Sequence, residues 1–134
     1  MGIGGFNLDK HLTNQLAYIP YYNINNQYHI NIHGLLIGGR NTTLTLSDFS
    51  SGRGSIIDSG TTMLYTDPEI FEKILERFDE FCGANENNCA GTEREENSNC
   101  FTPRDLLKAK ADFKEWASSF PIFEFEMDNN YIYN

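Results

Sequence analysis

The chain has 134 residues, a formal charge of −9 at pH 7 and a pI near 4.6. This length suffices for one domain with a core of its own. The acidic balance argues against nucleic-acid binding, which requires a basic face. No apolar run is long enough to cross a membrane, and the first residues lack the basic-then-apolar pattern of a signal peptide.

Apolar and polar residues alternate over residues 27–33, which predicts a half-buried strand. The two histidines of this segment, His29 and His33, share the polar face, whereas Tyr28, Ile30 and Ile32 share the apolar one. Residues four apart on a strand are separated by roughly 13 Å. We therefore expect the two histidines to be solvated side chains rather than metal ligands.

Two turns are expected next. Gly38–Asn41 ends the first strands, and the alternation over Thr42–Leu46 predicts a returning strand. Ser50–Gly54 predicts the second turn. Asn41-Thr42-Thr43 is also a candidate N-glycosylation acceptor, with Asn41 as the modified residue.

The segment Ser55–Thr62 reads Ser-Ile-Ile-Asp-Ser-Gly-Thr-Thr and places a carboxylate, Asp58, at the end of an apolar strand. Burying such a carboxylate is costly unless hydrogen-bond donors or a second acid share its charge. Three hydroxyls follow it closely, on Ser59, Thr61 and Thr62. The pattern is typical of a catalytic acid, although Asp-Ser-Gly alone is also a common turn.

Two helices are predicted after this motif. The first, Pro68–Phe81, begins with proline and an acidic residue, and carries one apolar stripe. The second covers Thr102–Trp116, with its apolar residues toward the protein: Leu106, Leu107, Ala109, Phe113 and Trp116. Alternation over Phe123–Met127 predicts a strand, followed by a turn at residues 128–130 and a last apolar segment. The fold class is mostly β with two helices.

The polar segment Gly83–Asn99 carries or adjoins three cysteines, Cys82, Cys89 and Cys100. Zinc binding competes with disulfide formation here, but no histidine lies nearby and the spacings are not those of a zinc motif. We expect one disulfide, Cys89–Cys100 or Cys82–Cys100, with the third cysteine free or paired outside the chain. A disulfide indicates an oxidising compartment.

The segment around Asp58 resembles the second active-site motif of the pepsin-like aspartic peptidases, an apolar pair followed by Asp-Ser/Thr-Gly-Thr/Ser. Further segments resemble that family's second lobe in order and type: Gly2–Phe6, Tyr18–Tyr21, Tyr28–Ile32, Gly34–Gly39, Pro68–Phe81 and Phe120–Phe125. The resemblance covers nearly the whole chain. It implies one lobe of the bilobal acid-protease fold.

The family has two lobes, each with one catalytic Asp, whereas this chain has a single Asp-Ser/Thr-Gly motif. The family's later apolar-apolar-Gly motif is also missing, because the comparable Phe81-Cys82-Gly83 ends a helix and follows Asp58 too soon. We therefore expect residues 1–134 to be a partial C-terminal lobe, without the first lobe and the end of the second. A family cysteine near the place of Cys100 often pairs further along, which agrees with an odd cysteine count.

The resemblance assigns a role to each residue of the motif. Asp58 is one of two carboxylates that activate a water for hydrolysis of a peptide bond. Ser59 reaches toward the other lobe, the N–H of Gly60 and the hydroxyl of Thr61 bind the carboxylate, and Thr62 contacts substrate. Neither a metal nor a cofactor is required.

The implied partners are a polypeptide substrate and the N-terminal lobe that carries the second Asp. The implied location is the secretory pathway, a lysosome- or vacuole-like compartment, or the outside of the cell. Two alternatives stay open beside a two-lobe endopeptidase. The chain could be part of a peptide-binding relative, or an inactive fragment, that lacks the second acid. It could also form a homodimer of the retroviral type, although the order of its elements argues against this.

Overall fold

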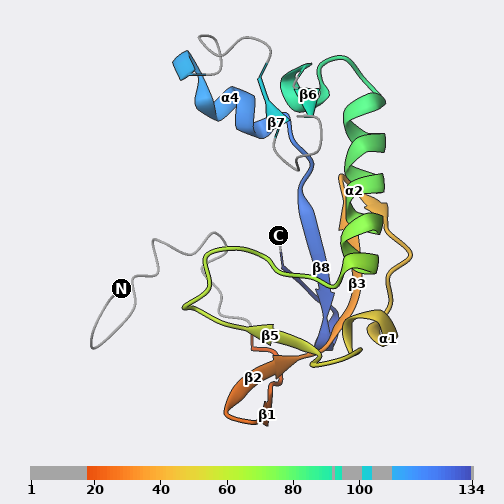
Figure 1. Ribbon diagram of the computed structural model, residues 1–134, viewed down its shortest axis with the longest axis vertical. Helices are drawn as coiled ribbons and strands as arrows, with labels where there is room; N and C mark the ends of the chain where they lie inside the picture. Colours follow the sequence, from red (N-terminus) through yellow and green to blue (C-terminus); the bar gives the residue numbers. More distant parts are fainter. Residues whose placement is uncertain (1–17, 92, 95–100, 104–109, 134) are drawn as a thin grey trace.

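The computed structural model describes residues 18–91, 93–94, 101–103 and 110–133. Its architecture is mostly β, as the sequence predicts, with helices beside and above the sheets (Figure 1). The elements are, in chain order, β1 (Tyr22–Ile24), β2 (Gln27–Ile30), β3 (Ile32–Ile37), β4 (Arg40–Asn41), α1 (Leu46–Phe49), β5 (Ser55–Ile57), α2 (Pro68–Gly83), η2 (Asn88–Gly91), β6 (Glu93–Arg94), β7 (Phe101–Thr102), α4 (Phe113–Ser118), β8 (Phe123–Met127), η3 (Asp128–Asn130) and β9 (Tyr131–Tyr133).

Two antiparallel sheets position the site. The larger has the strand order β4-β3-β8-β9 and joins the first part of the chain to its last part. The smaller has the order β1-β2-β5 and lies at the lower end of the molecule in Figure 1. A short β6-β7 pair lies at the opposite end, near α4. β2 and β3 are nearly continuous, so the two sheets are linked through one stretch of chain.

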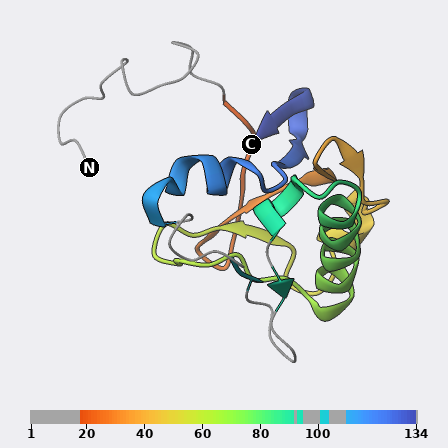
Figure 2. The ribbon, with the colours of Figure 1, turned by 90° about the horizontal axis from the view of Figure 1, so that it is seen from above.

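The core lies between the larger sheet and two helices, α1 and α2. Seen from above, α2 stands beside the sheet (Figure 2). The buried cluster consists of Leu35, Ile37, Leu44, Phe49, Ile70 and Ile74, with Ile32, Phe123 and Phe125 packed against it. Burying each such aliphatic side chain contributes roughly 1.5–3 kcal/mol. This cluster anchors β3. β2 precedes β3 almost directly in the chain and pairs with β5, so the position of β5 depends on the same core.

The first predicted helix is confirmed and extends two residues beyond its expected end, to Gly83. Asp67 is its N-cap and Pro68 occupies the first turn, where the missing N–H of proline costs no hydrogen bond. Ile70 and Ile74, one turn apart, are its buried residues. The apolar stripe read from the sequence is therefore core packing.

The strand predicted over residues 27–33 is interrupted at Asn31, and the expected alternation fails there. His29 and Ile30 are both buried, so the expectation that His29 is solvated is wrong, whereas His33 is exposed. The reason is the position of the loop before β5. Gly54 lies against the imidazole, where a Cβ would be 3.4 Å from Nδ1.

The strand predicted over Thr42–Leu46 is also absent. Thr43 has a positive φ of 65°, which ends β4 at Asn41. A helix, α1, begins instead, and Thr45 and Asp48 form a capping box at its start. Both backbone and hydroxyl groups of Thr45 donate to Asp48 Oδ2 at 2.8 Å.

The second predicted helix is confirmed over most of its described part, because residues 110–111 and 113–116 are helical, with a break at Asp112. Its predicted start is wrong, since Thr102 belongs to β7. α4 begins at Phe113, where Asp112 Oδ1 accepts a 3.1 Å hydrogen bond from the N–H of Glu115. Phe113 is 65% exposed rather than packed inward, whereas the ring of Trp116 packs edge-on against Phe120. The expected inward residues Leu106, Leu107 and Ala109 lie outside the described residues.

The disulfide joins Cys82 to Cys89, so both expected pairings, Cys89–Cys100 and Cys82–Cys100, are wrong. The cause is local. α2 carries Cys82 into its last turn, and the amide of Asn88 then donates to the Phe81 carbonyl at 2.6 Å, which turns the chain back. The two cysteines thereby come within 5.3 Å between Cα atoms. Cys100 lies outside the described residues.

Candidate active site

Asp58 follows directly on β5, which is hydrogen-bonded to β2. In this pairing Ile57 lies opposite Tyr28 and Ile56 lies opposite His29. The expected burial of the strand end is wrong: Ile57 is 51% exposed and Asp58 is exposed. Among the described residues, β2 is the one strand that pairs with β5, so the other edge of β5 stays uncovered.

Two donors hold the carboxylate of Asp58. The backbone N–H of Gly60 donates to Oδ1 at 2.8 Å, and the hydroxyl of Thr61 donates to Oδ2 at 2.7 Å. These bonds lower the pKa of Asp58 below the ordinary 3.8, the Thr61 hydroxyl more than the Gly60 N–H, because both favour the ionised form. A Cβ at Gly60 would lie 3.2 Å from Oδ1, so glycine allows the close approach.

The other two hydroxyls of the motif do not reach this carboxylate. Ser59 and Thr62 are exposed, and neither makes a hydrogen bond to another described residue. The sequence placed all three hydroxyls near Asp58, and the structure brings only Thr61 to it. The side chains of Ser59 and Thr62 are thus open to groups outside the described residues.

Asp48 offers a comparison within the same chain. Its carboxylate also accepts hydrogen bonds from a threonine hydroxyl and a backbone N–H, and its pKa is also lowered, first by the Thr45 hydroxyl. Asp48 serves to cap α1. Asp58 caps no helix, because the next one begins only at Pro68. Helix capping therefore accounts for the hydrogen-bonded carboxylate of Asp48 and not for that of Asp58.

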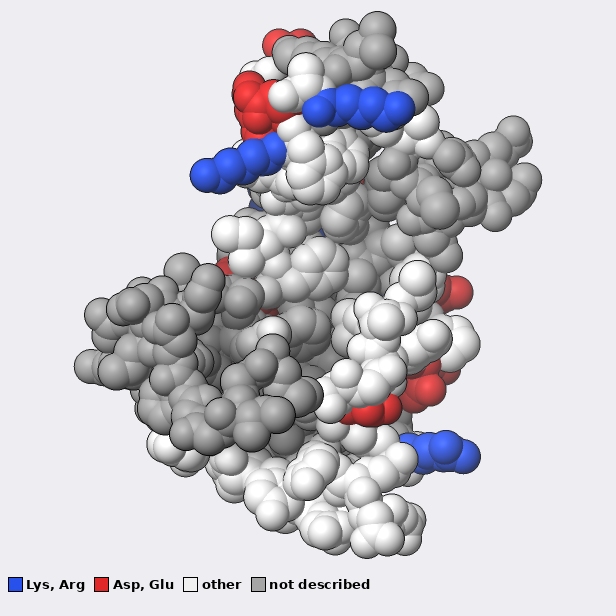
Figure 3. Space-filling model, turned by 90° about the vertical axis from the view of Figure 1, so that its left-hand side faces the viewer, with Lys and Arg blue, Asp and Glu red and all other residues white. Residues whose placement is uncertain are grey.

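Exposed apolar side chains lie on both sides of Asp58 in the sequence. Ile57 precedes it, and Met63, Leu64 and Tyr65 follow the motif in sequence, all of them largely exposed. A group of exposed large apolar residues beside a polar site is typical of a surface that another protein segment covers. Figure 3 shows that the lower end of the molecule, where the smaller sheet lies, is mostly uncharged over its described residues.

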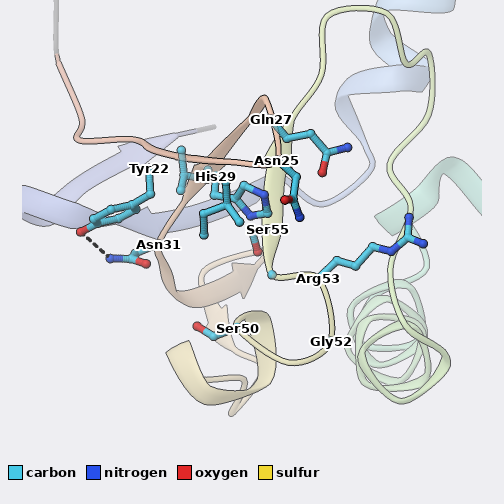
Figure 4. Close-up of a pocket in the computed structure, with 12 residues that line it drawn as sticks. Tyr22, Asn25, Gln27, His29, Asn31, Ser50, Gly52, Arg53 and Ser55 are labelled. Carbon is cyan, nitrogen blue, oxygen red and sulfur yellow. Dashed lines mark hydrogen bonds between the residues drawn. The ribbon is translucent and has the colours of Figure 1, made fainter.

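A cavity of about 650 Å³ opens beside the start of β5 (Figure 4). Its wall is formed by β1, β2 and the Ser50–Ser55 loop, and includes Tyr22, Gln27, His29 and Arg53. The sequence did not indicate this cavity. The signal that the sequence offered was Gly54, which has no side chain and lies beside His29.

His33 belongs to a separate polar contact. Its Nε2 lies 2.7 Å from Asp128 Oδ1, and the Asn31 amide donates to the other oxygen of Asp128 at 3.0 Å. These bonds tie the junction of β2 and β3 to the turn after β8. Within the described parts of the chain, no group of three potential ligands could hold a metal ion.

The remaining candidate residue, Asn41, is exposed on β4. Its Oδ1 accepts a hydrogen bond from the N–H of Thr43 at 2.6 Å. The acceptor asparagine is thus accessible from solvent. No helix among the described residues is long and apolar enough to span a membrane.

One comparison with known proteins gives a match. The family model described as xylanase inhibitor C-terminal matches residues 27–133, a range that includes β2, the whole Asp58 motif and β8. Neither curated proteins nor solved structures give a significant match to this chain.

Proposed function

Because the chain belongs to the pepsin-like aspartic peptidase family through its xylanase inhibitor C-terminal domain, a C-terminal lobe, we propose that Asp58 is one of two catalytic carboxylates of an endopeptidase. The observation that carries the proposal is the pair of hydrogen bonds from Gly60 and Thr61 to an exposed carboxylate that caps no helix. The second carboxylate comes from an N-terminal lobe, because this sequence has one Asp-Ser/Thr-Gly motif.

The reaction is hydrolysis of a peptide bond by water held between the two acids. One carboxylate takes a proton from the water as its oxygen attacks the scissile carbonyl carbon. The other acid, protonated, donates to the carbonyl oxygen as that carbon becomes tetrahedral. The C–N bond then breaks as the leaving amine takes the proton that the first carboxylate received from the water, and a hydroxyl of the tetrahedral carbon returns a proton to the second. Neither a metal nor a cofactor participates.

Hydrogen bonding at Asp58 suits the ionised partner of this pair. Gly60 and Thr61 both donate to it and so favour the charged form. A second carboxylate facing Asp58 would oppose this effect, since two like charges in contact resist ionising together. The resulting pKa values would belong to the pair.

The exposed residues around Asp58 supply contacts to the other lobe and the substrate. Ser59 and Thr62 are both exposed. In the proposed enzyme Ser59 bonds across to the first lobe and Thr62 contacts the substrate backbone. Ile57 and Met63–Tyr65 provide apolar area beside them. Covering this area on assembly would be favourable by roughly 25 cal/mol for each Å² of apolar surface removed from water.

A second candidate function is binding without catalysis. The family description names inhibitors of xylanase, and a lobe of this fold whose partner lacks an acid would bind a protein or peptide without cleaving it. The two candidates share the fold and differ in the residue that faces Asp58. The sequence that encodes the other lobe distinguishes them: a second Asp-Thr/Ser-Gly motif supports the peptidase, and its absence supports the binding protein.

The cellular location is proposed from covalent chemistry. The Cys82–Cys89 disulfide is stable in oxidising compartments, and Asn41 is an exposed acceptor for glycosylation. Both features fit the secretory pathway, with delivery to a lysosome- or vacuole-like compartment or to the outside of the cell.

An activity assay tests the proposal. The full-length protein that contains this chain should cleave an unfolded protein at acid pH, whereas the 134-residue chain alone should not. Cleavage by the chain alone that disappears in Asp58→Asn would contradict the two-lobe account and favour a homodimer. Absence of cleavage by the full-length protein would favour the binding function.

A further inference from the structure

The cavity lies beside β5, the strand that ends directly before Asp58. β2 and β5 pair so that His29 lies opposite Ile56 and Ile30 lies opposite Ser55. His29, Ile30 and Ser55 all line the cavity, which therefore adjoins the start of the strand that leads to Asp58. Ser55, which lines the cavity, is roughly 10 Å along the chain from Asp58 at the usual strand rise.

The lining of this cavity is suited to a negatively charged group. Arg53 contributes a guanidinium group, and Asn25 and Gln27 contribute side-chain amides. Figure 4 shows the side chains of Arg53 and Gln27 extending to the same side, to the right of the view. Among the described residues that line the cavity there is no Asp or Glu, although the chain as a whole carries a charge of −9.

Arg53 has no ion pair with another described residue, unlike Arg77, whose guanidinium lies 2.6 Å from Glu80. An arginine can bind a carboxylate through two parallel N–H···O bonds, a geometry that lysine lacks. The cavity therefore contains a cation that is free to bind an acidic ligand.

His29 provides a second, independent indication of a binding site. Its side chain lines the cavity and the residue is only 9% exposed, yet Nε2 has no hydrogen-bond partner among the described residues. A buried polar atom without a partner costs on the order of 1–3 kcal/mol. Native proteins contain few such atoms, and a bound group that supplies the missing hydrogen bond is one explanation for them.

We propose that this cavity receives the carboxylate side chain of an Asp or Glu residue in a bound polypeptide, with Arg53 as its main partner. The inference rests on the proposed function only in assuming that an extended peptide binds along β5 toward Asp58. Such a peptide advances about 3.3 Å per residue. The acidic residue would therefore lie roughly two or three residues from the one nearest Asp58.

Binding rather than cleavage is the appropriate measurement, because it does not require a catalytic partner for Asp58. The full-length protein carrying Asp58→Asn is titrated at pH ~6, where a Glu side chain is ionised, into fluorescent peptides. Each peptide in the series has one Glu, moved along an otherwise constant extended sequence. A matched series has Gln at the same positions, and affinity is read by fluorescence anisotropy.

We expect the Glu peptide to bind about 10-fold tighter than its Gln counterpart at one position, as one charged hydrogen-bonded pair would give. Arg53→Gln should remove that preference. Arg53 is exposed, so its replacement leaves the core intact. Arg40→Gln is the matched control, because Arg40 is an exposed arginine outside the cavity lining, and it should keep the preference.

Three results would overturn the inference: equal affinity for Glu and Gln at every position, an unchanged preference in Arg53→Gln, or no peptide binding at all. Cleavage by the unmodified full-length protein is measured in parallel and tests the proposed function separately. If the protein prefers Glu peptides through Arg53 but cleaves nothing, the binding site is supported and the peptidase function is contradicted. If it cleaves without a Glu preference, the peptidase function is supported and the binding site is contradicted.

Discussion

The hydroxyl of Thr61, three residues after Asp58 in the chain, donates a hydrogen bond of 2.7 Å to Oδ2 of Asp58. This bond is the largest cause of the lowered pKa of Asp58. With the 2.8 Å bond from Gly60 to Oδ1, it leaves both carboxylate oxygens fixed by donors of the same short loop. The loop thus orients the carboxylate before any substrate or partner is present.

Replacing Thr61 with Val should raise the pKa of Asp58 toward 3.8, because the variant keeps the shape of the side chain and loses the donor. The pH midpoint of Asp58 ionisation is measured by NMR titration of its carboxyl carbon. The pKa of Asp58 is lower in the folded than in the unfolded protein. Its ionised form therefore stabilises the fold above the unfolded pKa, and this stabilisation is lost as pH falls through the folded pKa. Thr62→Val is the matched control and should leave the midpoint unchanged, whereas an equal shift in both variants would contradict the assignment.

The disulfide should be Cys82–Cys89 in the folded protein. Peptide mapping of the unreduced protein by mass spectrometry should recover these two cysteines in one linked species. Replacing both with Ala should lower the free energy of unfolding by about 2 kcal/mol, as the chain-entropy model gives for so short a loop. A linked peptide that joins Cys100 to Cys82 or Cys89 would contradict the pairing.

Gly38 and Gly39 provide a matched test of packing between β3 and α2. Both have positive φ, 56° and 74°, so an alanine at either position meets backbone strain of about 1 kcal/mol. A Cβ at Gly38 would also overlap the ring of Phe81, whereas a Cβ at Gly39 has nothing within 4 Å. Urea unfolding should therefore show a larger loss of stability for Gly38→Ala than for Gly39→Ala. Equal losses would show that the ring moves aside without cost.

Asn41 should carry a glycan when the full-length protein passes through a secretory pathway that glycosylates Asn-X-Thr sequences. Mass spectrometry of the secreted protein should show a glycopeptide that is absent in Asn41→Gln. Thr43→Ala should remove it as well, since Thr43 completes the acceptor sequence. An unmodified Asn41 in the secreted protein would refute this prediction.

Local signals predicted much of the fold correctly. Pro68 and the spacing of Ile70 and Ile74 define α2, and the alternation over Phe123–Met127 defines β8. At the candidate site, the motif correctly predicted that the Gly60 N–H and the Thr61 hydroxyl bind the carboxylate of Asp58. Both hydrogen bonds lie within one turn of chain, so they depend on local sequence alone. Such features depend on neighbours in sequence.

The errors arose where neighbours in space decide. Burial of His29 results from the pairing of β2 with β5 and from the space that Gly54 leaves, neither of which a single alternating segment reveals. The Thr45–Asp48 capping box was readable, but the alternation around it favoured a strand. Exposure of Asp58 contradicts the expected burial because the second edge of β5 is uncovered within the described residues.

The most direct measurement of the central claim compares Asp58→Asn with Asp48→Asn in the full-length protein. Both replacements remove one hydrogen-bonded carboxylate of lowered pKa, and only Asp58 belongs to the proposed catalytic pair. The rate of cleavage of an unfolded protein at acid pH and the thermal midpoint are recorded for each. Asp58→Asn should reduce the rate by at least about 10²–10⁴-fold with little change in the midpoint. Asp48→Asn should weaken the α1 cap by about 1 kcal/mol and keep the rate. Near-native cleavage by Asp58→Asn would show that Asp58 is an ordinary turn residue and would contradict the account.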